Sequence, residues 1–301
     1  MDLSTIQGII PPLVTPFRPD GSIDEATHRA DVRYMVETAK VHGVAVCGST
    51  GEGHTLSTEE TRRIAAITVE EVRGRVPVIV GIITDSTQSA IDRIRALDGL
   101  DIAAVQVTPV HYVFRPDDDA MVRHFDALAT RGGRPVIIYN VIPWSYLLPR
   151  LLVRILRDVD GVVGVKQSAS DMKALGDLLL LVEEQGIADK VRIMSAVDAM
   201  LYPSFALGAQ GAIAAILSAC PEWSVALWDA VKKGDHPAAL RLHKKLLFVW
   251  NAIEAPNLPA NTRTVMGLTG REGGVPRSPM PPSSPQQVEA IRAALEAAKA
   301  L

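Results

Sequence analysis

The stretch VVGVKQSASD, Val162–Asp171, places a lysine directly after an apolar run that has the character of a buried β-strand. Valine favours strands, and a continuous apolar run that does not alternate with polar residues is typical of strands covered on both faces. Lysine is strongly hydrated and is seldom buried. Lys166 therefore lies where a buried parallel strand should end, and its role depends on what surrounds that strand.

Eight β-rich runs occur between the start of the chain and about residue 215, and helix-like segments separate them. The runs are IIPPLVTPF, GVAVCGS, VPVIVGI, DIAAVQVTP, RPVIIYN, GVVGVKQS, VRIMSA and GAIAAI. The helix-like segments include residues 24–41, 57–73, 86–97 and 117–130, each opened by Asp or Ser as an N-cap. Eight alternating units favour a (β/α)8 barrel. An open doubly wound sheet is the alternative, but its glycine fingerprint is missing after the first run.

The chain beyond the eighth run has a different organisation. Residues 221–254 have the pattern of two amphipathic helices joined by the turn KKGDHP, and a Pro/Gly-rich patch then precedes a last helix over residues 286–301. We therefore expect residues 1–220 to form the barrel and residues 221–301 to form a C-terminal helical extension packed on it. The extension is expected to be helical padding or an oligomer face.

Composition excludes several classes of function. The chain has 301 residues, 48% of them hydrophobic, and a net charge of −3. Because no basic cluster is interleaved with aromatics, we expect no binding to nucleic acid or to an anionic membrane. Two cysteines are too few for a disulfide framework, which indicates reduced thiols and the cytoplasm. No basic leader or apolar run of about 18 residues occurs, so we expect a soluble, unexported protein.

Barrel enzymes carry their chemistry at the carboxyl ends of the strands, so the residues that end each run are the candidates. The second run ends in a small-residue turn in which Gly48, Ser49 and Thr50 offer backbone N–H groups and two hydroxyls. Such a turn can hold a carboxylate or phosphate, although an ordinary helix-capping turn is the alternative. Tyr139 ends the fifth run, where its phenol could relay protons or could simply belong to the core.

Two explanations are possible for a lysine at position 166. A lysine withdrawn from water holds its proton less firmly, and the neutral amine can then attack a carbonyl. A lysine whose side chain reaches from the strand end into solvent is the alternative. The other strand ends decide between them.

GSTGE after the second run, YN after the fifth and GVKQS in the sixth together resemble the dihydrodipicolinate synthase and N-acetylneuraminate lyase family of class I aldolases. The resemblance covers nearly the whole chain, including LVTPF and the C-terminal helices. It implies that Lys166 forms a Schiff base with pyruvate or another 2-oxo acid and that Tyr139 shuttles protons. It also implies that Ser49 and Thr50 hold the substrate carboxylate and that Ser49 passes a proton to Tyr139. No metal or organic cofactor is implied, and the expected assembly is a homotetramer built as a dimer of dimers.

Two loops depart from the synthase branch of that family. There a tyrosine reaches in from a neighbouring subunit on a TPYY-like loop, whereas TPVHYVFRP here offers His111 or Tyr112. The synthase branch also has an arginine after its YNVP motif, where this chain has Trp144 and Ser145. Because a guanidinium is the natural bidentate partner of a carboxylate, we do not expect a role in lysine biosynthesis.

The expected second-substrate region is mostly apolar. KQSASD is similar to the sialate lyase branch, but the positions that bind a polyol there include Val197 and Ala215 here, with Asp198 as the polar exception. Asp198 could instead cap the helix that follows it. A site lined by Trp144, Val197, Ile213 and Ala215 favours an apolar aldehyde.

The predicted function is a Schiff-base-forming lyase or aldolase that joins or separates a 2-oxo acid and an apolar aldehyde. A dehydratase or decarboxylase that uses the same imine, and a non-catalytic sensor of 2-oxo acids, are the alternatives. A divalent-metal aldolase is disfavoured because His42, His54 and His111 form no ligand set in the sequence.

Overall fold

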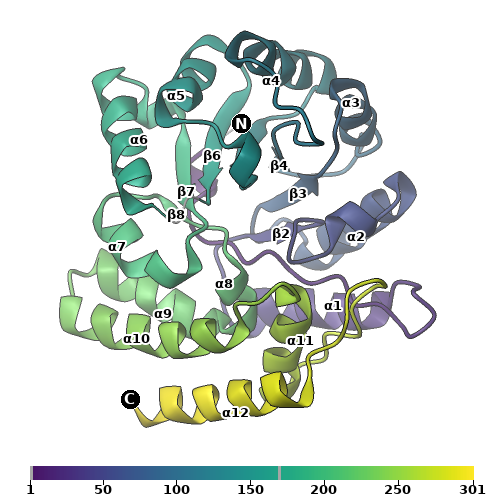
Figure 1. Cartoon of the computed structure of the whole chain (residues 1–301), viewed down its shortest axis with the longest axis vertical. Helices are drawn as coiled ribbons and strands as arrows, with labels where there is room; N and C mark the ends of the chain where they lie inside the picture. The colour runs from purple at the N-terminus through teal and green to yellow at the C-terminus, as the bar shows by residue number, and fades with distance from the viewer. Residues whose placement is uncertain (1–2, 169–170) are drawn as a thin grey trace.

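Eight parallel strands form the centre of the molecule. The computed structural model describes residues 3–168 and 171–301, so Ala169 and Ser170 of the KQSASD stretch and the first two residues lie outside it. The strands follow the order β1-β8-β7-β6-β5-β4-β3-β2 (Figure 1). They are β1 Gly8–Ile9, β2 Val44–Val46, β3 Val78–Ile82, β4 Ala104–Val107, β5 Val136–Asn140, β6 Val162–Gln167, β7 Arg192–Ser195 and β8 Gly211–Ala212.

The segment directly after β1 pairs with β2 and closes this sheet into a barrel. Leu13 N donates to Ala45 O at 2.8 Å, and Ala45 N donates to Pro11 O at 2.9 Å. A parallel bridge joins Pro12 to Ala45 at the same place. The predicted (β/α)8 barrel is confirmed.

Helices cover the outside of the barrel between successive strands. They are α1 Glu25–Arg33, α2 Thr58–Val72, α3 Thr87–Arg95, α4 Asp118–Gly132, α5 Pro149–Asp158, α6 Met172–Glu184, α7 Leu201–Ala206 and α8 Ala215–Ala219. The side chains of Asp24, Ser57, Ser86 and Asp117 each accept a hydrogen bond from a backbone N–H in the first turn of α1 to α4. These caps confirm the helix starts predicted from the sequence.

Four helices follow the barrel: α9 Pro221–Lys232, α10 His236–Ile253, α11 Leu258–Leu268 and α12 Pro285–Ala300. The long helix α10 packs between α9 and α12, while α11 packs against α8 and α12 (Figure 1). Helix α11 was not predicted from the sequence. The division of the chain into two domains at residue 220 stays a prediction.

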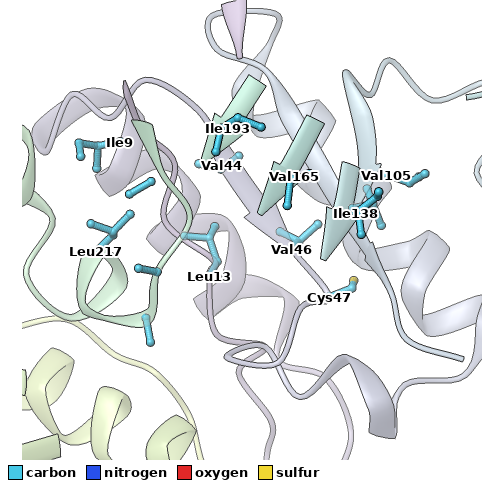
Figure 2. Close-up of a cluster of buried hydrophobic side chains, with 14 of the residues drawn as sticks. Ile9, Leu13, Val44, Val46, Cys47, Val105, Ile138, Val165, Ile193 and Leu217 are labelled. Carbon is cyan, nitrogen blue, oxygen red and sulfur yellow. The ribbon is translucent and has the colours of Figure 1, made fainter. Parts of the chain in front are cut away.

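Strand residues alternate between two apolar layers. One side packs against the helices, and Figure 2 shows this cluster with Val44 and Val46 from β2, Val105 from β4, Ile138 from β5 and Val165 from β6. The other side forms a smaller cluster inside the barrel. Its buried members are Ile6, Ile10, Ala45, Ile79, Ala104, Ile137, Met194 and Ile213. The strands are therefore covered on both faces, as their continuous apolar runs indicate.

Among the residues that the structure describes, no helix combines the length and apolar character needed to cross a membrane.

Candidate active site

Lys166 projects from β6 into the barrel mouth and is almost fully buried, with 3% of its surface exposed. The β5–β6 register pairs Tyr139 with Lys166. The lysine Nζ consequently lies 3.7 Å from the centroid of the Tyr139 ring. The lysine does not reach out to solvent, which removes the solvent-directed alternative.

Tyr139 connects this amine to the turn after β2. Its hydroxyl donates to Ser49 Oγ at 3.2 Å. Tyr139 is buried, whereas Ser49 is exposed. Three side chains from different strand ends thus form a chain from a buried amine to the surface, and hydroxyls in such a chain can carry protons.

Unusual backbone geometry shapes the turn that carries Gly48, Ser49 and Thr50. Cys47, just before it, has a φ of 58°, which is strained for a residue with a side chain. Gly53 N donates to Gly48 O at 2.9 Å and closes the turn. A Cβ on Gly81 of β3 would lie 2.3 Å from Cys47 O, so only glycine allows β3 to approach this closely.

An ion pair anchors the far side of the same turn. Glu52 is fully buried, and its Oε1 lies 2.6 Å from Nη2 of Arg263 in α11. Glu52 Oε2 also accepts a hydrogen bond from Arg277 N at 3.0 Å. Burial lowers the pKa of Arg263, while Glu52 opposes that shift. The substrate-binding turn proposed from the sequence is therefore tied to the C-terminal helices.

A cavity of about 470 Å³ opens beside Lys166. Eight of the residues predicted for the site line it: Ser49, Thr50, Tyr139, Lys166, Val197, Asp198, Ile213 and Ala215. Further walls come from the C-terminal helices, through Trp250 and Glu254 at the end of α10 and Leu258 and Pro259 at the start of α11. Sequence reasoning missed these four, because no local pattern indicates that α10 and α11 dock over the barrel mouth.

A second hollow, of about 500 Å³, includes Arg75, Val76 and Asp101 in its lining. It lies at the amino ends of β3 and β4. Barrel enzymes carry their active sites at the opposite, carboxyl end of the strands, and residues at the amino ends usually serve stability. The cavity at Lys166 is therefore the candidate active site.

Asp198 has both a structural and a cavity-facing position. Its Oδ1 accepts a hydrogen bond from Ile216 N at 2.7 Å, which fixes the loop after β7 to the first turn of α8. It thus caps α8 and not the helix that directly follows it. Burial raises the pKa of Asp198 to about 6, although the Ile216 N–H and the charge of Lys166 oppose this rise.

His111, Tyr112 and Trp144 lie outside the residues that line the cavity of this chain. Trp144 is 64% exposed, and its Nε1 donates to His111 O at 2.7 Å. His111 Nδ1 lies 3.3 Å from Asp85 Oδ1. Tyr112 is 72% exposed. These contacts join the loops after β3, β4 and β5. The predicted substrate-binding roles of these three residues stay predictions.

Gly48 also lies outside the cavity lining, at the base of the turn. Within residues 3–168 and 171–301, no group of three or more His, Cys, Asp or Glu side chains could hold a metal ion.

Residues 5–298 match the Dihydrodipicolinate synthetase family. The chain belongs to that family. A relative from Pelobacter propionicus named 4-hydroxy-tetrahydrodipicolinate synthase is 34% identical over 91% of this chain and 93% of its own. A protein of the same name from Methanopyrus kandleri is 32% identical over 97% of this chain and 96% of its own.

Solved structures of the dihydrodipicolinate synthetase family share the whole fold. Dihydrodipicolinate synthase from Thermotoga maritima superposes with a TM-score of 0.92 at 26% identity, covering 99% of this chain and 100% of that one. A prophage family member from E. coli K12, solved in complex with pyruvate, gives a TM-score of 0.91 at 25% identity. The match covers 98% of this chain and 99% of that one. The chain is thus an enzyme of this family, whose members are class I, lysine Schiff-base lyases.

Proposed function

We propose that Lys166 forms a Schiff base with pyruvate or another 2-oxo acid, and that the enzyme makes or cleaves a carbon–carbon bond between this acid and an aldehyde. The observation that carries the proposal is the connected set of the buried Lys166 amine, the Tyr139 ring 3.7 Å away and the Tyr139–Ser49 hydrogen bond. The pyruvate bound to the E. coli relative supports the choice of 2-oxo acid.

Imine formation assigns a role to each of these groups. The neutral Lys166 amine attacks the ketone carbon, the ketone oxygen takes a proton from the Tyr139 hydroxyl, and the nitrogen returns one of its protons to the Tyr139 phenolate, which gives a neutral carbinolamine. Loss of that oxygen as water, with a further proton delivered through Tyr139, gives the iminium. Ser49 returns protons to Tyr139 from the exposed side. Tyr139, as the phenolate, takes a proton from the methyl carbon to give an enamine, which attacks the aldehyde carbon. The aldehyde oxygen receives that proton, and water then hydrolyses the iminium to release the product and the Lys166 amine; cleavage is the reverse.

The Gly48–Thr50 turn is proposed to hold the carboxylate of the 2-oxo acid. Ser49 and Thr50 line the cavity beside Lys166 and carry both hydroxyl and backbone N–H donors. A carboxylate there would accept charge-assisted hydrogen bonds, which are stronger than neutral ones. The ketone carbon of the 2-oxo acid would then face the Lys166 amine.

The aldehyde partner is proposed to be apolar. Val197, Ile213, Trp250 and Leu258 line the cavity, and no arginine is among the described residues that line it. The carboxyls of Asp198 and Glu254 would repel a second anionic group. Trp250 adds a tryptophan to this lining, and the predicted role of Trp144 stays a prediction.

We further propose that the chain acts in the cytoplasm as a homotetramer, a dimer of dimers. Tyr112, Val113 and Phe114 form a highly exposed apolar tip on the loop after β4, and such a tip is costly to leave in water. Sedimentation analysis of the wild-type protein and of a Phe114→Ser variant would test the assembly. A monomeric wild-type protein would contradict it.

Borohydride trapping tests the central step. Incubation with pyruvate, reduction and digestion should leave the adduct on the peptide that contains Lys166, as read by mass spectrometry. Lys166→Arg keeps a cation but cannot form the imine, so its adduct should disappear. The matched control is Lys173→Arg, since Lys173 is an exposed lysine paired with Asp177 on α6; it should trap like the wild type. An intact fold with no adduct from any 2-oxo acid would favour a sensor.

Turnover assays on the enzyme without borohydride allow the aldehyde to be identified. Turnover with pyruvate should be faster for benzaldehyde or butyraldehyde than for aspartate semialdehyde or N-acetylmannosamine. A preference for either of the last two would refute an apolar partner. Release of water or carbon dioxide without an aldehyde would instead identify the dehydratase or decarboxylase.

A further inference from the structure

Gln106 of β4 is a buried polar side chain inside the protein. It is 0% exposed. Neither its Nε2 nor its Oε1 has a hydrogen-bond partner among the residues that the structure describes. The Oγ1 of Thr108, two residues further along and 1% exposed, is also unpaired in the described part of the chain. Buried amides in folded proteins are almost always hydrogen-bonded, so this pair requires an explanation.

Strand register places Gln106 inside the barrel. It pairs with Gly81 of β3 on one side and with Ile137 of β5 on the other. Ile137 and Ala104 belong to the interior apolar cluster. Since side chains two residues apart on a strand point to the same face, Gln106 and Thr108 share the interior face with Ala104.

Gln106 also lies directly against the turn after β2. Its Nε2 is 2.9 Å from the position that a Cβ on Gly48 would occupy. The neighbouring Gly81 is packed on the same turn, because its Cβ would meet both Cys47 O and Gly48 N. The amide therefore fills the space beneath Gly48 that a larger residue at position 48 would need.

An apolar side chain would fill that space without the cost of burying an unpaired amide. Leucine or methionine has a similar volume, and the interior cluster around it is already apolar. The amide is therefore poorly explained by packing. An amide offers one acceptor and two donors, which suits a partner that both donates and accepts, such as water.

We propose that Gln106 is a positioning residue: with Thr108 it binds an internal water beneath Gly48, and this water supports the turn that holds the carboxylate of the 2-oxo acid. The water accepts from Gln106 Nε2, and its own hydrogens remain free to bond towards the turn and the bound carboxylate. A neutral amide does this without placing a competing charge under the anion. The inference rests on the proposed function and deepens it at the carboxylate site.

Gln106→Met removes the hydrogen bonds and keeps the volume. The dissociation constant for pyruvate, measured from the concentration dependence of borohydride trapping at Lys166, should rise about three- to tenfold, the usual value of one hydrogen bond. The maximum trapping rate should change little, because Tyr139 and Lys166 are untouched. Thermal unfolding should occur at the same or a higher temperature. The control Ile79→Val alters the same interior cluster without polar atoms and should leave pyruvate affinity unchanged.

Gln106→Glu adds a second measurement, the pH dependence of pyruvate affinity, which a change in packing alone would not alter. Its carboxyl donates like the amide when protonated, but repels the substrate carboxylate when ionised. Pyruvate affinity relative to the wild type should therefore be nearly normal at low pH and should weaken as pH rises. Unchanged affinity in Gln106→Met, or a Gln106→Glu ratio independent of pH, would overturn the inference while trapping at Lys166 stands. Absence of trapping in the wild type would instead overturn the proposed function itself.

Discussion

The amine of Lys166 lies over the face of the Tyr139 ring because β5 and β6 pair these two residues directly. Adjacent parallel strands bring their ends to the same edge of the barrel, so the register alone sets the distance between amine and ring. The ring covers the amine while its hydroxyl points on to Ser49. One backbone pairing thus supplies both the shielding and the proton path that the proposed imine chemistry requires.

Removing the Tyr139 hydroxyl should slow catalysis strongly. Tyr139→Phe keeps the ring over Lys166 but cannot relay a proton, so kcat should fall by about 10²- to 10⁴-fold. Ser49→Ala should cause a smaller loss, because water can replace its hydroxyl on the exposed side. Since the two act in one chain, the double variant should be little slower than Tyr139→Phe alone. Steady-state kinetics of the three variants would measure this, and fully additive losses would contradict a shared path.

The Glu52–Arg263 pair should matter more for stability than any exposed pair. Arg263→Met leaves a buried carboxylate without its counter-charge, which should cost about 3–5 kcal/mol of unfolding free energy. Glu52→Gln combined with Arg263→Met should cost less than Arg263→Met alone. Urea unfolding would compare them with Lys173→Met, which breaks an exposed pair with Asp177 and should cost under about 1 kcal/mol. Equal losses of unfolding free energy at the two sites would contradict a larger stabilising role for the buried pair.

Two glycine-to-alanine substitutions should have opposite effects. Gly81→Ala forces a methyl group against the Cys47 carbonyl and should destabilise the fold by about 1–3 kcal/mol while weakening pyruvate binding. Gly176→Ala lies within α6 with open space around it, and should stabilise the protein by up to about 1 kcal/mol. Denaturant unfolding and pyruvate trapping on both variants provide the check. A neutral Gly81→Ala would show that the turn can move away from β3.

Asp198 should make stability depend on pH in the mildly acidic range. Because its pKa is raised from 3.8 to about 6 in the folded protein, the folded state holds this proton more tightly than the unfolded chain. The resulting stability is present below pH 4 and is lost as pH rises through 6. Asp198→Asn keeps the acceptor for Ile216 N but cannot ionise.

The unfolding free energy of the wild type relative to Asp198→Asn should therefore fall by roughly 2 kcal/mol between pH 4 and pH 6. This value is smaller than the free energy that corresponds to the full pKa shift, because the side chain is partly exposed and solvent screens its charge. Chemical unfolding at a series of pH values would measure the difference. A constant difference across that range would show that the carboxyl keeps its ordinary pKa.

The barrel and its central side chains could be predicted from sequence because each depends on local pattern and strand order. Lys166 and Tyr139 end continuous apolar runs, and parallel strands place such ends together. The run from Ile9 to Phe17 was predicted as one strand, but β1 ends at Ile9. Pro11 and Pro12 have no N–H to donate to a neighbouring strand, which limits regular pairing there.

Contacts between distant segments could not be predicted in this way. Trp250 reaches the cavity because α10 docks across the barrel mouth, and the periodicity of α10 only indicates that one face is buried. The exposed Trp144 follows a strand end, which made it a candidate from sequence, yet it bonds to the loop of His111. The unpaired amide of Gln106 is likewise visible only once β3, β4 and the turn at Gly48 are placed together.

The ion pair between Glu52 and Arg263 also bears on how the protein is synthesised. Glu52 leaves the ribosome long before Arg263 is translated. Until then the turn behind Ser49 holds a carboxylate with no counter-charge, and a nascent barrel cannot settle into its final form. Enzymatic competence should therefore arise only after Arg263 has left the ribosome, and a message truncated before residue 263 should yield a barrel that cannot hold its substrate.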